Sequence, residues 1–372
     1  MRPLQKRLLF TAVVVGGIFA ALEVGARVAF SADLEAAEAP PPQPQDGAPT
    51  MKGNPYLLWE QAPGVRYEHG IKANINSMGL RGEEPVIPKP DGVRRILVTG
   101  DSSVYGFRVE DDETYVNVAA DQLGVEGWNA AIPGYSSYQS LNLLEMRAWA
   151  LEPDVLIISN IWSDNNFDSF VDKELLSAYS SFEGTRGATL NNLLSPLAFY
   201  RVLRYRLTIA KGQQAEARKV GWQLGSGAQV GVRRVEINDY ARNLDRLAEM
   251  ALSDGAEVVF VMLANREDLS DRFASTAWTP YRDVMEDIAE RHGAPVIEVR
   301  PMFRESGLAG DDLFIDEMHP TAVGHKMIGD ALAETLKPWA EGGTVMSEGT
   351  GAPIEHYVDP FVFDGQRGPP GP

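Results

Sequence analysis

The chain has 372 residues, 44% of them hydrophobic, which is enough for one large domain with appendages or for two small domains. Its formal net charge of −18 at pH 7 argues against a nucleic-acid partner, because phosphate binding relies on a clustered basic surface. Because the chain has no cysteine, disulfides, thiolate zinc sites and cysteine lipidation are excluded.

The first 30 residues carry the pattern of a targeting segment. Arg2, Lys6 and Arg7 precede an apolar run over residues 8–22, an arrangement typical of a secretory signal or a signal anchor. Residues 29–31 form an acceptable small-residue cleavage site. The sequence therefore predicts either a single-pass membrane anchor, with the rest of the chain outside the cytoplasm, or a protein secreted after cleavage. An ordinary core helix is the alternative.

Three flanking segments surround the main domain. Residues 31–53 contain a proline-rich stretch and predict a linker. Residues 54–92 mix short apolar pieces with turn residues, which predicts an irregular or β-rich lead-in packed on the main domain. Residues 341–372 are rich in Gly and Pro and predict an extended or disordered tail.

Strand-like and helix-like segments alternate over residues 93–340. This alternation predicts an α/β fold, a three-layer α/β/α sandwich around a mainly parallel sheet, whose sites lie at the carboxyl ends of the strands. The predicted strands are residues 94–99, 127–131, 155–158, 257–262 and 295–299. The predicted helices are residues 114–123, 138–150, 240–251 and 281–292, and a last helix that includes residues 323–332.

Residues 167–234 interrupt the alternation. Apolar side chains at helical spacing over residues 196–209, with arginines between them, predict a helix. We expect an inserted helical subdomain or lid over the strand ends, or a packed surface excursion without a role in substrate binding.

Two short motifs carry the chemistry. Residues 100–103 read Gly-Asp-Ser-Ser directly after the first strand, and residues 316–320 read Asp-Glu-Met-His-Pro ahead of the last helix. Together they supply a nucleophile (Ser102), a base (His319) and an orienting acid (Asp316), the parts of a serine hydrolase.

Rival catalytic patterns fit less well. An α/β-hydrolase elbow needs glycine two residues after the nucleophile, and this chain has Val104. The five histidines are scattered and form no HExxH motif, so we expect no metal and no other cofactor. No motif singles out a carboxylate pair for glycoside cleavage.

The two motifs resemble the first and last blocks of the SGNH (GDSL-type) hydrolase superfamily, in their bacterial membrane-anchored or exported form. Residues 131–136, Ala-Ile-Pro-Gly-Tyr-Ser, resemble the second block, and Pro153-Asp154 with the following strand resembles the lead-in to the third. The segment Asn-Ser-Met-Gly-Leu-Arg-Gly at residues 76–82 resembles the lead-in of many anchored members.

The resemblance implies a flavodoxin-like fold and a role for each motif residue. Ser102 would attack an ester carbonyl, His319 would take its proton, and Asp316 would orient the imidazole. The backbone N–H groups of Ser102 and Gly134 would bind the oxyanion. The third block usually ends in Gly-x-Asn-Asp, whose asparagine is the third oxyanion donor. Here Ser163 stands in that position, so either Ser163 or Asn165 would supply the donor.

The sequence thus predicts an exported serine esterase that acts on small-molecule, glycan or lipid esters and not on nucleic acid. Hydrolysis or transfer of acyl groups, O-acetyl groups in particular, on extracytoplasmic glycans is the leading interpretation. A lipase or thioesterase of the same family is one alternative. A catalytically impaired SGNH-like binding protein is the other. Membrane contact would come through the N-terminal helix, and the sequence does not identify protein partners.

Overall fold

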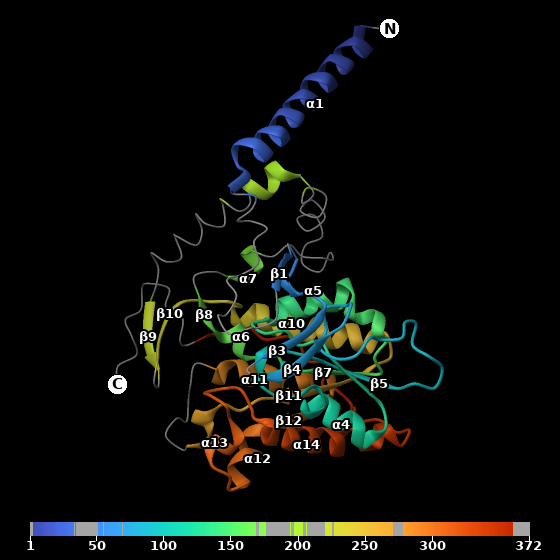
Figure 1. Ribbon diagram of the computed structural model, residues 1–372, viewed down its shortest axis with the longest axis vertical. Helices are drawn as coiled ribbons and strands as arrows, with labels where there is room; N and C mark the ends of the chain where they lie inside the picture. Colours follow the sequence, from blue (N-terminus) through green and yellow to red (C-terminus); the bar gives the residue numbers. More distant parts are fainter. Residues whose placement is uncertain are drawn as a thin grey trace.

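The structure of the chain is a computed structural model (Figure 1). It describes residues 3–32, 34, 51–54, 56–68, 70–168, 171–175, 194, 197–203, 206, 220–224, 227–270 and 278–359.

A five-stranded parallel sheet forms the centre of the molecule. Its strands follow the spatial order β12-β11-β7-β5-β6, and every neighbouring pair is parallel. All residues of β5 and β7 are buried, because helices cover both faces of the sheet. The strands are β5 (Arg95–Thr99), β6 (Glu126–Asn129), β7 (Val155–Ile158), β11 (Glu257–Met262) and β12 (Val296–Glu298).

Two groups of helices enclose this sheet (Figure 1). Helices α4 and α14 pack on each other, while α10 packs on both α5 and α11. This arrangement confirms the predicted α/β/α sandwich. The longer helices are α4 (Tyr115–Leu123), α5 (Ser137–Met146), α10 (Ile237–Ser253), α11 (Thr279–His292) and α14 (Ala322–Ala340). The shorter ones are α3 (Ser102–Tyr105), η1 (Asp111–Glu113), η2 (Ala148–Leu151), α6 (Trp162–Asn165), α7 (Asp172–Leu175), η3 (Arg266–Leu269), α12 (Val299–Glu305) and α13 (Gly310–Leu313).

The strand order fixes where a site can form. Numbered along the chain, the five strands lie in the order 2-1-3-4-5, the flavodoxin-like doubly wound arrangement. The order reverses between β5 and β7, and doubly wound folds place their sites outside the carboxyl ends of the strands at such a switch point. The Gly-Asp-Ser-Ser motif follows β5, and residues 159–165 follow β7. Both motifs therefore lie at the switch point of the sheet.

The predicted lead-in is β-rich and packs on the domain. Strands β1 (Met51–Asn54) and β2 (Leu58–Gln61) form one antiparallel pair, and β3 (Gly64–Glu68) and β4 (Ile71–Ile75) form another. Strand β1 begins inside the segment predicted as linker; residues 35–50 of that linker lie outside the described residues. Side chains of α5 bind this region, since Gln139 donates to the Leu57 carbonyl at 2.6 Å.

The inserted segment differs from the predicted helical subdomain. Residues 198–203 are helical, but β8 (Phe167–Asp168), β10 (Gly227–Arg233) and β9 (Val220–Leu224) form a three-stranded antiparallel sheet. The remainder of the predicted helix over residues 196–209 lies largely outside the described residues. Helical spacing at the centre of the insert carries no information about the strands at its two ends.

The N-terminal apolar run lies within helix α1 (Pro3–Ala29). Near its end, Ala26 packs with Ala198 and Val202, and the Phe19 and Phe199 rings lie 5.8 Å apart. Within the parts of the chain that the structure describes, no helix is both long and apolar enough to cross a membrane. The anchor and the compartment stay predictions.

The C-terminal tail is extended and tied to the domain over residues 344–359; residues 360–372 are outside the description. Ser347 N–H donates to the Gly293 carbonyl at 2.8 Å, and Tyr357 exchanges two hydrogen bonds with the Asn238 side chain. The Asp359 carboxylate pairs with the buried guanidinium of Arg233 at 2.8 Å. Backbone hydrogen bonds and one ion pair thus hold a segment whose composition suggested only an extended tail.

Substituting the glycine that ends α11 tests this attachment. Gly293 has φ +69°, and a Cβ there would collide with the Ser347 carbonyl. Gly293→Ala should therefore release the tail, and amide exchange of residues 345–351 should accelerate at least tenfold. Gly124→Ala is the matched control, because Gly124 ends α4 at φ +65° with no atom within 4 Å of its Cβ position. Both variants carry the backbone strain of about 1–2 kcal/mol, so equal exchange rates would refute the tail's dependence on Gly293.

Candidate active site

Three side chains from the two ends of the domain meet in one hydrogen-bonded chain. His319 Nε2 lies 2.7 Å from Ser102 Oγ, and His319 Nδ1 lies 2.7 Å from Asp316 Oδ2. The structure therefore brings together the serine, histidine and aspartate that the motifs singled out. This is the spatial order of a nucleophile, a base and an orienting acid.

The loop before α14 keeps the Asp316 carboxylate ionised. Burial opposes its charge, but hydrogen bonds from the His319 ring and from the Met318 and His319 amides outweigh burial and hold the pKa of Asp316 well below its usual range. Both amides donate to Asp316 Oδ1 at 3.0 Å. A carboxylate so held stays charged and stabilises a protonated imidazole beside it.

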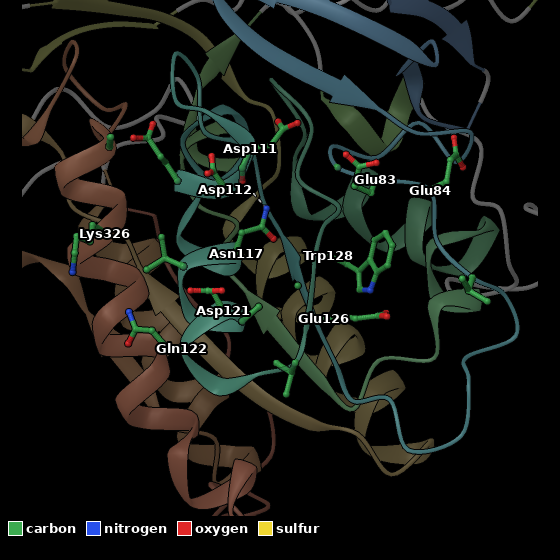
Figure 2. A pocket seen from close by; sticks show the side chains of 18 of the residues that line it. Glu83, Glu84, Asp111, Asp112, Asn117, Asp121, Gln122, Glu126, Trp128 and Lys326 are labelled. Carbon is green, nitrogen blue, oxygen red and sulfur yellow. Dashed lines mark hydrogen bonds between the residues drawn. The ribbon is translucent and has the colours of Figure 1, made fainter.

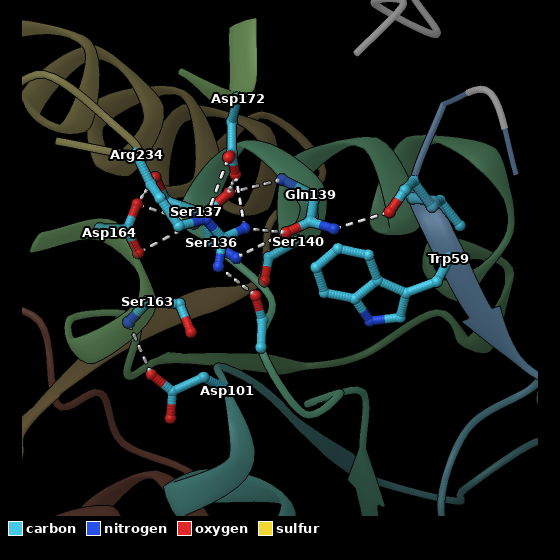
Figure 3. Close-up of polar contacts among 12 residues, drawn as sticks. Trp59, Asp101, Ser136, Ser137, Gln139, Ser140, Ser163, Asp164, Asp172 and Arg234 are labelled. Atoms are coloured by element: carbon cyan, nitrogen blue, oxygen red, sulfur yellow. Dashed lines mark hydrogen bonds and ion pairs between the residues drawn. The ribbon is translucent and has the colours of Figure 1, made fainter. Parts of the chain in front are cut away.

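Asp101 fixes the nucleophile turn. It is the N-cap of α3, where its Oδ1 accepts from the Ser103 amide at 3.0 Å. Its Oδ2 accepts from the Ser163 amide at 3.1 Å, which joins the loops after β5 and β7 (Figure 3). Burial raises the pKa of Asp101, although both of these hydrogen bonds favour its charged form.

A second contact joins the nucleophile turn to the histidine loop. The Ser103 hydroxyl donates to the Met318 carbonyl at 3.0 Å, across 215 residues of sequence. Phe107 then packs on the His319 ring at 5.0 Å between centroids. These contacts hold Ser102 and His319 at a fixed separation, which the proton transfer between them requires.

The two predicted backbone donors carry unpaired N–H groups. Within α3 the amides of Ser103, Val104 and Tyr105 all bind Asp101. Among the hydrogen bonds of the described residues, none uses the amide N–H of Ser102 or of Gly134. Both donors are therefore available to an oxyanion.

The loop after β7 contains the candidates for a third donor. Ser163 and Asn165 are both buried, and Ser163 is held through its backbone by Asp101. The Asn165 side-chain amide Nδ2 is buried without a hydrogen-bond partner. Asn160, in contrast, donates its Nδ2 to Ser140 Oγ at 2.9 Å. Both Ser163 and Asn165 thus remain candidates.

A buried polar network lies beside this loop (Figure 3). The Asp164 carboxylate accepts from the amide and the hydroxyl of Ser137, and that hydroxyl in turn accepts from Asn243 Nδ2 at 2.9 Å. Burial raises the pKa of Asp164 to about 7, against the hydrogen bonds from Ser137 that favour the charged form. Asp164 therefore titrates near neutral pH.

The remaining histidine of this region has a structural role. His325 is fully buried in α14, and its Nδ1 accepts from the Tyr115 amide at 3.2 Å. Burial, with smaller contributions from Arg81 and His319, lowers the pKa of His325 to about 3, so the ring is neutral.

A large cavity lies away from the triad. It has a volume of about 1060 Å³ and is lined by residues 82–84 and 86 of the lead-in and by residues of η1, α4, β6 and the start of α14. Many of these residues carry carboxylates (Figure 2). None of Ser102, Asp316 and His319 belongs to its lining. Over the described residues, no group of three His, Asp or Glu side chains could hold a metal ion. The candidate site formed by Ser102, His319 and Asp316 is therefore distinct from this cavity.

Sequence reasoning missed three residues of the site: Asp101 as the link between two loops, and Trp59 and Arg234, which bind the Pro133 and Gly134 carbonyls. The motif Gly-Asp-Ser contained a signal for Asp101, since aspartate before a short helix is a preferred N-cap. Trp59 and Arg234 bind backbone carbonyls of distant segments. Because every residue has a backbone carbonyl, no motif in the sequence predicts these two contacts.

No family model and no curated protein matches the chain. Among solved structures it is similar to a lipase/acylhydrolase from Enterococcus faecalis, at 15% identity over 66% of this chain and 97% of that one, TM-score 0.43. It is also similar to a member of the lipolytic G-D-S-L family from Veillonella parvula, at 14% identity over 66% and 99%, TM-score 0.39. A third is the acetyl xylan esterase AlAXEase, at 13% identity over 65% and 99%, TM-score 0.41.

Single alanine variants identify the third donor. The side chain that binds the oxyanion should, when removed, lower kcat for an ester by about 10²–10³-fold, because one lost donor typically costs that much. Ser163→Ala and Asn165→Ala are each other's control, and only one should show the loss. Two variants with wild-type kcat would show that neither side chain is a donor.

Asp164→Asn tests the raised pKa. Because the folded pKa of about 7 exceeds the unfolded value of about 3.9, the stability that protonated Asp164 contributes is present at low pH and is lost as pH rises towards 7. Urea unfolding at pH 5, 6 and 7 should show wild type losing stability relative to Asp164→Asn by up to about 1.4 kcal/mol per pH unit. A constant difference between the two proteins would contradict the shifted pKa.

Proposed function

We propose that the chain is a serine esterase of the SGNH type that works through Ser102, His319 and Asp316. One observation supports the proposal above all others: a continuous chain of hydrogen bonds runs from Ser102 Oγ through both ring nitrogens of His319 to Asp316. It stands at the switch point of a doubly wound sheet, where such folds place their sites.

The geometry supports a two-step acyl transfer. Ser102 Oγ attacks the ester carbonyl carbon while its proton passes to His319 Nε2, and Asp316 stabilises the resulting imidazolium. His319 then gives that proton to the leaving alcohol, which leaves the acyl group on Ser102. A water, or an acceptor hydroxyl in the case of transfer, repeats the sequence and frees the serine.

Backbone amides would stabilise the charge that develops on the carbonyl oxygen. The N–H groups of Ser102 and Gly134 are unpaired among the described hydrogen bonds and follow the neighbouring strands β5 and β6. Donors fixed before the reaction stabilise the transition state without reorganisation.

The substrate part of the proposal follows from the predicted targeting segment. A catalytic domain held or secreted outside the cytoplasm would meet esters on cell-surface glycans, so O-acetyl groups are the leading substrate. The competing outcomes of the test are activity on long-chain lipid esters, activity on thioesters, and no useful turnover.

The full chain should hydrolyse p-nitrophenyl acetate, and Ser102→Ala should reduce the rate to background. Asp316→Asn should lower kcat by about 10⁴-fold, because a neutral amide no longer holds the imidazole in the required tautomer or stabilises its charge. Thr321→Ala, at the cap of α14, serves as a control beyond the triad. Equal rates for wild type and Ser102→Ala would refute the esterase.

Acyl-chain length separates the substrate classes. An acetyl esterase should turn over p-nitrophenyl acetate with a higher kcat/KM than the octanoate ester, and a lipase the reverse. Acetylated glycans with and without an acceptor sugar then distinguish hydrolysis from transfer.

A further inference from the structure

An indole from the lead-in lies against the turn that carries the second oxyanion donor. Trp59, in β2, donates its Nε1–H to the Pro133 carbonyl at 3.1 Å, 74 residues away. Its backbone carbonyl accepts from the Tyr135 hydroxyl at 2.6 Å, and the Trp59 and Tyr135 rings meet edge-on at 5.9 Å. The turn and the strand are therefore bound to each other by reciprocal contacts.

The conformation of that turn decides where the Gly134 N–H points. Tyr135 N–H donates to the Ile132 carbonyl at 3.0 Å, so residues 132–135 form a hydrogen-bonded β-turn. Proline at the second position and glycine at φ +79° in the third define type II. Type I and type II turns differ chiefly by a flip of the central peptide, which here joins Pro133 to Gly134.

That central peptide contains both groups of interest. In a trans peptide the C=O and the N–H point in opposite directions. A donor on the Pro133 carbonyl therefore fixes the Gly134 N–H on the other side of the turn, away from Trp59. The flipped peptide would lose this hydrogen bond and would turn the N–H towards the indole.

Sterics and a second donor reinforce this orientation. A Cβ on Gly134 would lie 2.9 Å from Trp59 Cζ2, so the ring packs directly on the glycine. On the following peptide, Arg234 Nη1 donates to the Gly134 carbonyl at 2.7 Å. Arg234 is itself held by Asp172 and Gln139, which are buried (Figure 3).

We propose that Trp59 is a positioning residue for the oxyanion hole: its indole N–H holds the Pro133–Gly134 peptide so that the Gly134 N–H faces the reacting carbonyl. The inference rests on the proposed esterase function. It makes the lead-in segment part of the catalytic apparatus.

Removing the indole N–H tests the proposal in the full chain. Trp59→Phe should lower kcat for p-nitrophenyl acetate by about 10-fold or more, less than the 10²–10³-fold of a donor lost outright. KM should change by less than about twofold, because the donor acts in the transition state. The shape of the pH–rate profile should persist, since the Ser102–His319–Asp316 contacts are untouched.

Two further variants make the result decisive. Trp149→Phe is the matched control, because it also removes an indole hydrogen bond, to Asp254 Oδ2 at 2.5 Å. A kcat for Trp59→Phe no lower than that of Trp149→Phe overturns the inference. If Trp59→Phe loses its cooperative unfolding transition, β-(3-benzothienyl)alanine at position 59 keeps the ring shape and removes only the N–H. Wild-type kcat with this isostere also overturns it.

The failure of this inference is distinguishable from failure of the proposed function. Unchanged hydrolysis by Ser102→Ala would refute the esterase itself. A Ser102-dependent rate that does not respond to the loss of the Trp59 N–H would leave the esterase intact and refute only the positioning role.

Discussion

The buried carboxylate of Asp101 is the interaction on which the site depends. It caps α3 through the Ser103 amide and binds the Ser163 amide with its other oxygen, so one side chain fixes the turns after β5 and β7. Placing a carboxylate in a fully buried position costs free energy, and its raised pKa reflects that cost. The backbone N–H groups of Ser103 and Ser163 offset this free-energy cost, and their hydrogen bonds fix the positions of the two turns. Asp101 thus adds a direct link between the turn that carries Ser102 and the loop after β7.

Elsewhere in the site, other side chains also bind backbone atoms of distant segments. Ser103 reaches the Met318 carbonyl, Trp59 reaches Pro133, and Arg234 reaches Gly134. Such contacts fix backbone orientation, which is what an oxyanion hole made of N–H groups requires. These contacts bind the loops that leave β5 and β6 to segments outside themselves, and Asp101 does the same for the loop that leaves β7.

The sequence predicted the sheet and the triad for different physical reasons. β7 and β11 were readable because strands buried on both faces are continuous apolar runs. The three residues of the triad could be predicted because nucleophilic catalysis needs particular residue types, which here stand in two short motifs at residues 100–103 and 316–320. Gly134 was readable only through the resemblance of its block. By contrast, Trp59 binds the backbone carbonyl of Pro133, and every residue has such a carbonyl. The residue types in a single sequence therefore could not predict this contact.

Two segments outside the central sheet contact the turn that contains Gly134. The lead-in at residues 54–92 and the insert at residues 167–234 looked like appendages to a complete hydrolase domain. Yet Trp59 of the first binds the Pro133 carbonyl of this turn, and Arg234, at the end of the second, binds the Gly134 carbonyl. The Pro133–Gly134 sequence itself favours a type II turn, and contacts from outside the turn add to that preference. If the Gly134 N–H binds the oxyanion as proposed, folding of the lead-in and the insert onto the sheet supports that donor through Trp59 and Arg234.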